Sequence, residues 1–250
     1  MSSSVGSDPQ QLLHAVWDGN MRRVKTVLKA GANVDGCPRY ACAPIVAATM
    51  AGHADIVECL LEQGADPDRP VTQKVPCIRL DLATIMPGER ALHLAAKRGK
   101  LGIVRLLLKR GRADPNVTDS RGRTPLLLAC ECPNAYCVEV VSLLLEAGAD
   151  PIFADERGYT PLHAVAEYSN GMDLADMLCT RAPAALDICC SKDDTPLFVA
   201  CARGHEGMVS KLLSLGSRQC VPHDKVKKFP LGMAAYLGFV GVVRVLINEG

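Results

Sequence analysis

The chain has 250 residues, and its 28 Lys and Arg residues against 27 Asp and Glu residues give a formal net charge of +1. This near-neutral balance excludes general electrostatic attraction as a way to bind nucleic acid or an anionic membrane. No stretch approaches the roughly 18 consecutive apolar residues of a membrane-spanning helix, so we expect no membrane insertion.

Residues 1–7 are rich in Ser and Gly, and we predict that they are disordered. They have neither the charged nor the apolar part of a signal peptide, and Ser2 excludes N-myristoylation. The chain has twelve cysteines, but without an export signal or a fixed cysteine spacing they do not indicate a secreted disulfide scaffold. We therefore expect reduced thiols and a location in the cytoplasm or the nucleus.

The first predicted structural unit is a pair of short helices. Asp8-Pro9 supplies a cap and a first-turn proline, and the apolar residues between Leu12 and Val16 follow at helical spacing. The partner helix, Asn20 to Ala30, carries four basic residues, which suits a terminal unit with one face in water.

The same unit returns along the chain and is clearest from Asp193 to Gly216. Thr195-Pro196 starts a helix that ends at Gly204, and a second apolar-periodic helix ends at Gly216. Two such short helices are not stable alone in water, so they must stack on neighbours. The position of Pro196, the proline column, recurs with steps of 33, 47, 34, 36, 35 and 34 at Gln11, Pro44, Ala91, Pro125, Pro161, Pro196 and Pro230.

The step of 47 reflects an insert at residues 69–88, where Ile78, Leu80 and Leu82 alternate with polar residues as in a short strand. We interpret the insert as a long loop lying on its neighbours, with a docking element as the alternative. Arg112 adds one residue to a Gly-Ala-Asp turn, and residues 132–137 lengthen the turn between two helices.

Two further departures affect the later units. Arg181-Ala182-Pro183-Ala184 replaces Gly-Ala-Asp, which leaves the geometry of that loop open. The last helix, from Phe239 to Ile247, is almost entirely apolar, whereas a terminal repeat needs a polar outer face. We therefore interpret the sequence as part of a longer protein that is monomeric when whole. The 250-residue chain alone should self-associate, and a chain ending at Ser217 should not.

The period, together with Thr160-Pro161-Leu162-His163 and the Gly-Ala-Asp turns at Gly64 and Gly148, resembles the ankyrin repeat over roughly residues 8–250. The resemblance implies an all-α solenoid of about seven helix-turn-helix repeats joined by finger loops, elongated and slightly curved. The predicted repeats are residues 8–35, 36–68, 84–118, 119–154, 155–189, 190–223 and 224–250.

The cysteines and histidines have structural interpretations. Cys130 and Cys201 share the column of Ala96 and Ala166, as small buried residues do. The resemblance gives His93 and His163 a structural role, with the imidazole bonded to the backbone or to the Thr of nearby repeats. Two minor alternatives stay open, zinc binding by the remaining cysteines and oxidation of an exposed thiol at Cys132 or Cys137. The cysteines weighed for zinc are Cys130-x-Cys132-x₄-Cys137 and Cys189-Cys190 with Cys220-x₂-His223.

No nucleophile-base-acid arrangement or phosphate-binding loop is present in the sequence, so we expect neither an enzyme nor a cofactor. The resemblance implies a protein-binding module of the adaptor or scaffold type, with a partner of unknown identity on the concave face and finger loops. One alternative is the targeting module of a larger enzyme, such as a ubiquitin ligase, kinase or acyltransferase, with its catalytic domain beyond residue 250. Another is a small-ligand or metal-binding protein built on the cysteines.

The family's variable positions lie 5, 4 and 2 residues before the proline column and 6 and 7 after it. Five of the six Trp and Tyr residues fall there, as do several Arg and Glu residues. Trp, Tyr and Arg are the usual hot spots of protein interfaces. The four Phe residues miss these positions, and we expect them to pack in the interior. The predicted partner-binding residues are Trp17, Tyr40, Lys97, Arg98, Arg121, Arg123, Glu131, Arg157, Tyr159, Glu167, Tyr168, Arg203 and Tyr236.

Overall fold

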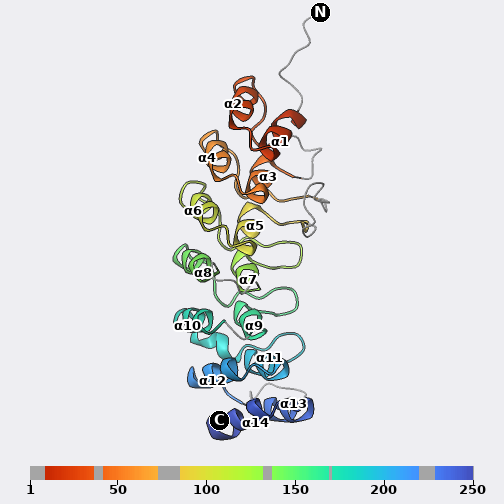
Figure 1. The fold of residues 1–250 in the computed structure, drawn as a ribbon, viewed down its shortest axis with the longest axis vertical. Helices are drawn as coiled ribbons and strands as arrows, with labels where there is room; N and C mark the ends of the chain where they lie inside the picture. The colour runs from red at the N-terminus through yellow and green to blue at the C-terminus, as the bar shows by residue number, and fades with distance from the viewer. Residues whose placement is uncertain are drawn as a thin grey trace, which may run out of the picture. The chain divides into compact units, whose positions relative to one another are not determined.

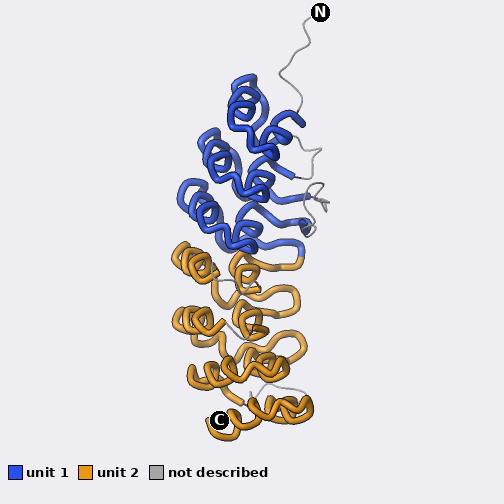
Figure 2. Tube along the Cα trace, viewed as in Figure 1, with its two compact units in different colours: residues 1–120 blue, residues 121–250 orange. Residues whose placement is uncertain are grey.

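The computed structural model describes residues 9–36, 42–72, 85–131, 137–168, 171–219 and 229–249. Within these ranges the chain forms fourteen α-helices, one short 3₁₀ helix and no strand, so the predicted all-α class is confirmed. The residues divide into two compact units, 1–120 and 121–250, which are described separately (Figure 2).

In the first unit, the helices form three antiparallel pairs (Figure 1). The first helices of successive pairs pack on one another, α1 on α3 and α3 on α5, and the second helices do the same, α2 on α4 and α4 on α6. The unit is thus two helix layers deep. The helices are α1 (Pro9–Trp17), α2 (Met21–Lys29), α3 (Pro44–Ala51), α4 (Ala54–Glu62), α5 (Ala91–Lys97) and α6 (Leu101–Lys109).

The second unit repeats this arrangement four times. Its first helices are α7, α9, α11 and α13, its second helices are α8, α10, α12 and α14, and each helix packs on the next one in its layer. The bounds are α7 (Pro125–Cys130), α8 (Cys137–Glu146), α9 (Pro161–Ala166), α10 (Met172–Arg181), η1 (Pro183–Asp187), α11 (Pro196–Arg203), α12 (Glu206–Ser214), α13 (Pro230–Leu237) and α14 (Val240–Glu249).

Helices begin and end where the sequence supplies caps. The Thr195 hydroxyl accepts a hydrogen bond from the Phe198 N–H at 3.2 Å, which satisfies one of the free amides in the first turn of α11. Gly204 ends the helix with φ +74°, and Gly216 follows the next helix with φ +97°. Both glycines therefore occupy the left-handed conformation that the sequence predicted for them.

The one-residue insertion at Arg112 changes which residue takes the left-handed position. In the Gly-Ala-Asp turns, Gly64 and Gly148 have φ values of +84° and +91°. In the third repeat Arg112 itself has φ +54°, and a non-glycine residue there carries a steric cost of about 1 kcal/mol. The insertion is tolerated but strained.

The replaced turn at Arg181–Ala184 folds in a different way. Instead of a Gly-Ala-Asp turn, the chain continues from α10 into the 3₁₀ helix η1, which buries Ala185 and Leu186. Apolar burial in η1 thus takes the place of the missing turn residues.

Only the ends of the 69–88 insert are described, and they are joined by backbone hydrogen bonds. The Val71 N–H donates to the Glu89 carbonyl at 2.9 Å, and the Gly88 N–H donates to the Val71 carbonyl at 2.8 Å. The alternating residues Ile78, Leu80 and Leu82, on which the strand interpretation rested, lie outside the described residues.

Candidate protein-binding surface

The predicted partner-binding residues come from two kinds of element. One group lies at the C-terminal end of a first helix or directly after it. The other group lies in the loops before α7 and α9. Tyr40 and the insertion residue Tyr136 lie outside the described residues. In the first unit Trp17 is half-buried at the end of α1.

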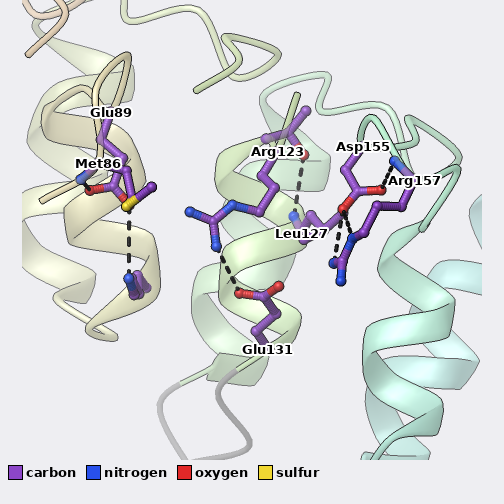
Figure 3. Close-up of polar contacts among 9 residues, drawn as sticks. Met86, Glu89, Arg123, Leu127, Glu131, Asp155 and Arg157 are labelled. Atoms are coloured by element: carbon purple, nitrogen blue, oxygen red, sulfur yellow. Dashed lines mark hydrogen bonds and ion pairs between the residues drawn. The ribbon is translucent and has the colours of Figure 1, made fainter. Parts of the chain in front are cut away.

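In the first unit, Lys97 is paired with a carboxylate that the sequence did not single out. Lys97 Nζ lies 3.8 Å from Glu89 Oε1, and the Glu89 side chain is fully buried. Figure 3 shows Glu89 beside Met86. Glu89 Oε2 also accepts a hydrogen bond from the Met86 N–H at 2.8 Å. Removing Lys97 would leave a buried charge with less compensation, so Lys97 has a structural role as well as an exposed surface.

Arg98 and Arg90 also make internal bonds in the first unit. The Arg98 guanidinium donates to the Met50 carbonyl at the end of α3, at 3.1 Å. Arg90 donates to three carbonyl oxygens, those of Asp68 (2.8 Å), Gly88 (3.2 Å) and Thr118 (2.6 Å). Arg90 therefore holds three loops together, a role that sequence reasoning missed because the bonded carbonyls lie up to 28 residues away.

In the second unit, Arg123 is largely withdrawn from solvent. It is only 8% exposed, and its guanidinium lies 3.5 Å from a Glu131 carboxylate oxygen on the same repeat (Figure 3). Arg123 thus has little surface to offer a partner, and Glu131, which is half-buried, presents the more accessible group of the pair.

Arg157 and Tyr159 are held in place by Asp155. One Asp155 carboxylate oxygen accepts from the Arg157 backbone N–H at 2.8 Å, and the other accepts from Arg157 Nε at 3.0 Å (Figure 3). The first oxygen also accepts from the Tyr159 backbone N–H at 2.9 Å. The Arg157 guanidinium lies 5.1 Å from the centre of the Tyr159 ring, which permits a cation–π interaction. The Tyr159 ring in turn lies 4.9 Å from the His163 ring.

Glu167 and Arg203 complete this cluster from two successive first helices. Their side chains pair at 2.9 Å, and the Glu167 carbonyl accepts from His205 Nε2 at 2.8 Å. Burial raises the pKa of Tyr159 above its ordinary value, and the nearby Glu167 carboxylate adds to the increase. Tyr159 is therefore neutral at physiological pH. Tyr168, which follows Glu167 and is half-buried, interacts electrostatically with Arg203. We call Arg157, Tyr159, Glu167, Tyr168 and Arg203 the Tyr159 cluster.

The loops that carry these residues are linked by backbone hydrogen bonds. In the second unit, the Glu156 N–H donates to the Arg121 carbonyl at 3.1 Å, and the Ser191 N–H donates to the Arg157 carbonyl at 2.7 Å. The backbone that carries each of these two arginine side chains is thus held by a hydrogen bond from the next loop. The signal that sequence reasoning missed is the repeated Asp-x-Arg-Gly at residues 119–122 and 155–158, whose aspartates are both buried.

The histidine prediction is confirmed at His163. Its Nδ1 accepts from the Thr160 N–H at 3.2 Å, so Nε2 carries the proton and donates to the Asp194 carbonyl of the next repeat at 2.9 Å. Burial lowers the pKa of His163, which keeps the ring neutral. His93 accepts in the same way from the Arg90 N–H, at 3.2 Å.

The cysteine column is buried as predicted. Cys130 and Cys201 are 1% and 0% exposed, and burial raises the pKa of Cys201 to about 12. Cys137, which we expected to be exposed, is fully buried because it faces inward at the start of α8. Among the described residues no three His, Cys, Asp or Glu side chains are grouped as metal ligands. Cys132, Cys220 and His223 lie outside the described residues.

The phenylalanines divide in a way that the sequence did not predict. Phe198 is 7% exposed, as expected of a packing residue, but Phe229 is 54% exposed at the start of α13. Tyr236, on the same helix, is 86% exposed. The interior role expected of Phe229 is therefore wrong; among the described first helices of this unit, α11 is the one that packs on α13.

None of the described helices combines the length and the apolarity that a membrane crossing requires.

Comparison with known proteins identifies repeats along most of the chain. The family described as "Ankyrin repeats (3 copies)" matches residues 77–155, 136–223 and 162–250, and "Ankyrin repeat" matches residues 42–70. Human "Ankyrin repeat and SOCS box protein 16" is 32% identical over 216 residues, which cover 83% of this chain and 43% of that protein. Mouse "Diacylglycerol kinase iota" is 30% identical over 125 residues, 50% of this chain and 11% of the kinase. Mouse "2-5A-dependent ribonuclease" is 39% identical over 67 residues, 26% of this chain and 9% of the ribonuclease. The chain thus spans less than half the length of each of these three relatives.

Proposed function

Because this chain belongs to the ankyrin repeat family, whose repeats indicate a protein–protein interaction module, we propose that it is a non-enzymatic adaptor or scaffold. It binds a protein partner through the ends of its first helices and its finger loops. It acts in the cytoplasm or the nucleus, and the whole protein is a monomer that needs no cofactor.

The observation that carries this proposal is the Tyr159 cluster. Its members include two tyrosines and two arginines, residue types that are enriched at interface hot spots, together with one carboxylate. The Arg157 and Arg203 side chains are 65% and 56% exposed, so a partner can reach them. Both are already fixed by carboxylates, which lowers the entropy lost when a partner orders them.

Stability alone gives little reason for the pairing of Arg203 with Glu167. The Arg203–Glu167 pair is largely exposed, and exposed ion pairs contribute about 0–1 kcal/mol to folding. Burial of the same pair under a partner would strengthen it, because water would no longer screen the charges. This pair is therefore better suited to recognition than to folding.

The proposal is tested by recovering a partner with the whole chain and measuring its dissociation constant for single variants. Arg203→Ala and Tyr168→Ala should weaken binding by about 1–3 kcal/mol and leave the melting temperature almost unchanged. Tyr159→Phe, which keeps the ring on His163, is the more informative change at that position, because Tyr159→Ala would also remove packing.

Matched controls lie on the second helices, where Lys109 closes α6 and Glu146 closes α8, both exposed. Their alanine variants should bind normally. Loss of binding in the Lys109 or Glu146 variants, with normal binding by the Arg203 and Tyr168 variants, would place the partner on the opposite layer and end the proposal.

A second candidate function is favoured by the names of two relatives. Diacylglycerol kinase iota and 2-5A-dependent ribonuclease are named as enzymes, and each shares a similar segment over about a tenth of its length. In this alternative the chain targets a catalytic domain, such as a kinase, ubiquitin ligase or acyltransferase, to a substrate. Sequencing the whole transcript separates the two, because the alternative requires a catalytic domain encoded beyond residue 250.

A further inference from the structure

Helix α2, in the first unit, presents a face of positive charge to solvent. The helix packs on α1 and α4, which lie beside it in Figure 1, and its buried residue is Val24. Its exposed residues are four cations and one threonine, which we call the α2 face. They are Arg22, Arg23, Lys25, Thr26 and Lys29.

Helical spacing groups these residues on one side of α2. Arg22, Thr26 and Lys29 follow one another at steps of four and three residues, so they form a line along the helix. Arg23 and Lys25 flank this line on its two sides. From Arg22 to Lys29 the line spans about 10 Å, at about 1.5 Å per residue.

The four cations are not neutralised within the described part of the chain, where none of them forms an ion pair. Two acids of the neighbouring helix α4 are bound by Arg110 of α6, which reaches Glu58 at 2.8 Å and Glu62 at 3.2 Å. Neither Asp18, in the turn before α2, nor Asp55, in the first turn of α4, pairs with any of the four. The charges of the α2 face are therefore available to a ligand.

These charges oppose the stability of α2 itself. Arg22 and Arg23 lie in the first turn, where the helix dipole favours acids, and no acid is present there. Lys25 and Lys29 are four residues apart, a spacing at which like charges repel. By contrast, the second helices α4, α8, α10 and α12 each carry an acid in the first turn. The stability of the helix thus does not explain the α2 charges, whereas an anionic ligand would convert them into favourable contacts.

The α2 face fits an acidic protein segment better than a membrane or a nucleic acid. A helix that lies in a membrane surface inserts large apolar side chains, and the exposed residues of α2 include none. Four charges along about 10 Å match a short run of carboxylates, whereas duplex binding commonly uses about 6–10 phosphate contacts. Arginine also pairs with a carboxylate through two parallel hydrogen bonds.

We propose that the α2 face binds an acidic segment of a second protein, one with several Asp or Glu side chains in a short run. The site goes beyond the proposed function, because it belongs to the first unit and shares no residue with the Tyr159 cluster. Two sites of different chemistry would let an adaptor hold two proteins at once.

The probe is a fluorescein-labelled peptide with a run of about six glutamates, which is as long as the α2 face when helical. The same peptide with glutamine in place of glutamate is the comparison. Binding to the whole chain is measured by fluorescence anisotropy at low and at high salt. The glutamate peptide should bind saturably and more weakly at high salt, because salt screens exposed charges, and the glutamine peptide should not bind.

A double variant of the α2 face and a matched control locate the binding. Arg22→Gln combined with Arg23→Gln should weaken binding of the glutamate peptide about 5-fold or more. Arg105→Gln combined with Lys109→Gln removes two exposed charges from helix α6 of the same unit, so it changes the net charge equally. This control should bind the peptide within about 2-fold of the unaltered chain.

Arg22→Glu separates binding from folding. An acid in the first turn suits the helix dipole, so this variant should raise the melting temperature while it weakens binding of the glutamate peptide about 5-fold or more. Arg203→Ala, in the Tyr159 cluster, should bind the peptide normally, so this test and the test of the proposed function fail separately.

Equal losses in the α2 and α6 double variants would overturn the site, because they would show attraction by net charge alone. Equal binding of the glutamate and glutamine peptides, or normal binding by Arg22→Glu, would overturn it as well. If the peptide does not bind, while phosphatidylserine vesicles or duplex DNA bind and need Arg22 and Arg23, the face belongs to that ligand and the proposal fails.

Discussion

Helices α9 and α13 have the same place in their repeats but very different surroundings. Both begin at the proline column, yet every residue of α9 is buried, whereas in α13 only Pro230 and Ala234 are. Helix α9 packs between α7 and α11, while the first helix that packs on α13 among the described residues is α11. In this unit, burial of a first helix thus follows the described first helices that pack on it.

The same contrast in burial holds for single residues at equivalent positions of different repeats. In the fifth repeat His163 is fully buried and bonded at both ring nitrogens, whereas in the seventh repeat a Cβ added at the equivalent Gly232 would lie 3.8 Å from Phe229 Cβ. Six residues after the proline, Glu167 is bound by Arg203, while Tyr236 faces solvent. One column can thus stabilise the stack in one repeat and be free for recognition in another.

The largest expected difference between the two helices is in the free energy of unfolding. His163→Ala removes both ring bonds and leaves a cavity, so it should cost about 2–4 kcal/mol. Tyr236→Ala, at an 86% exposed position, should stay within about 0.5 kcal/mol of the unaltered chain. Urea titrations of both variants measure the two values, and a Tyr236 cost as large as that of His163 would remove the contrast.

The glycines at helix ends should matter less than His163 but more than a glycine inside a helix. Gly204→Ala should cost about 1–2 kcal/mol, because φ is positive and a Cβ there would lie 2.9 Å from the Phe239 ring. Gly216→Ala should cost about 1 kcal/mol through φ alone.

Gly207 is the internal control for these two changes. It lies in α12 without a positive φ, and an added Cβ would meet only the Met172 sulfur, at 3.8 Å. Gly207→Ala should therefore raise the melting temperature slightly. Equal melting temperatures for all three variants would contradict the helix boundaries.

A smaller effect is expected from pH through His163. Its pKa is lowered by burial in the folded chain, so the unfolded chain binds the proton more readily. Stability from the neutral ring is present above the ordinary value of 6.5 and declines as the pH falls through it. The decline should be shallower in His163→Gln, as measured by urea titrations over this pH range. An unchanged slope would show that His163 does not link folding to pH.

The smallest expected effect is a gain of stability at Arg112. Because Arg112 has φ +54° while Gly64 and Gly148 hold the corresponding left-handed position in other repeats, Arg112→Gly should stabilise the chain by about 0.5–1 kcal/mol. Glycine has a larger backbone entropy than arginine in the unfolded chain, which limits the stabilisation that Arg112→Gly can give. A melting temperature below that of the unaltered chain would show that the Arg112 side chain makes a compensating contact.

The repeating features of this fold were predictable from the sequence, because they depend on local rules. The cap at Thr195, the left-handed Gly204 and the buried Cys201 each follow from residue type and position in the repeat. The links between distant residues were not predictable, because several side chains could satisfy each charge. The carboxylate that pairs with Lys97 and the carbonyls that Arg90 joins became identifiable only in three dimensions.

For the candidate site, the sequence predicted positions but not accessibility. Arg123 and Arg203 were chosen by the same rule, yet the former is 8% exposed and the latter reaches solvent with a 56% exposed side chain. Repeat numbering gives the direction of a side chain, whereas exposure also depends on the sizes of its neighbours. Phe229 shows the converse, since a residue outside the chosen positions is 54% exposed.

The central claim is that a protein partner lies on the Tyr159 cluster and not on the second helices. The most direct measurement is site-specific photocrosslinking with benzoylphenylalanine in place of Tyr168, and separately in place of Glu146. Our account predicts a covalent adduct with the partner from position 168 and none from position 146. Adduct formation from position 146 alone would contradict it.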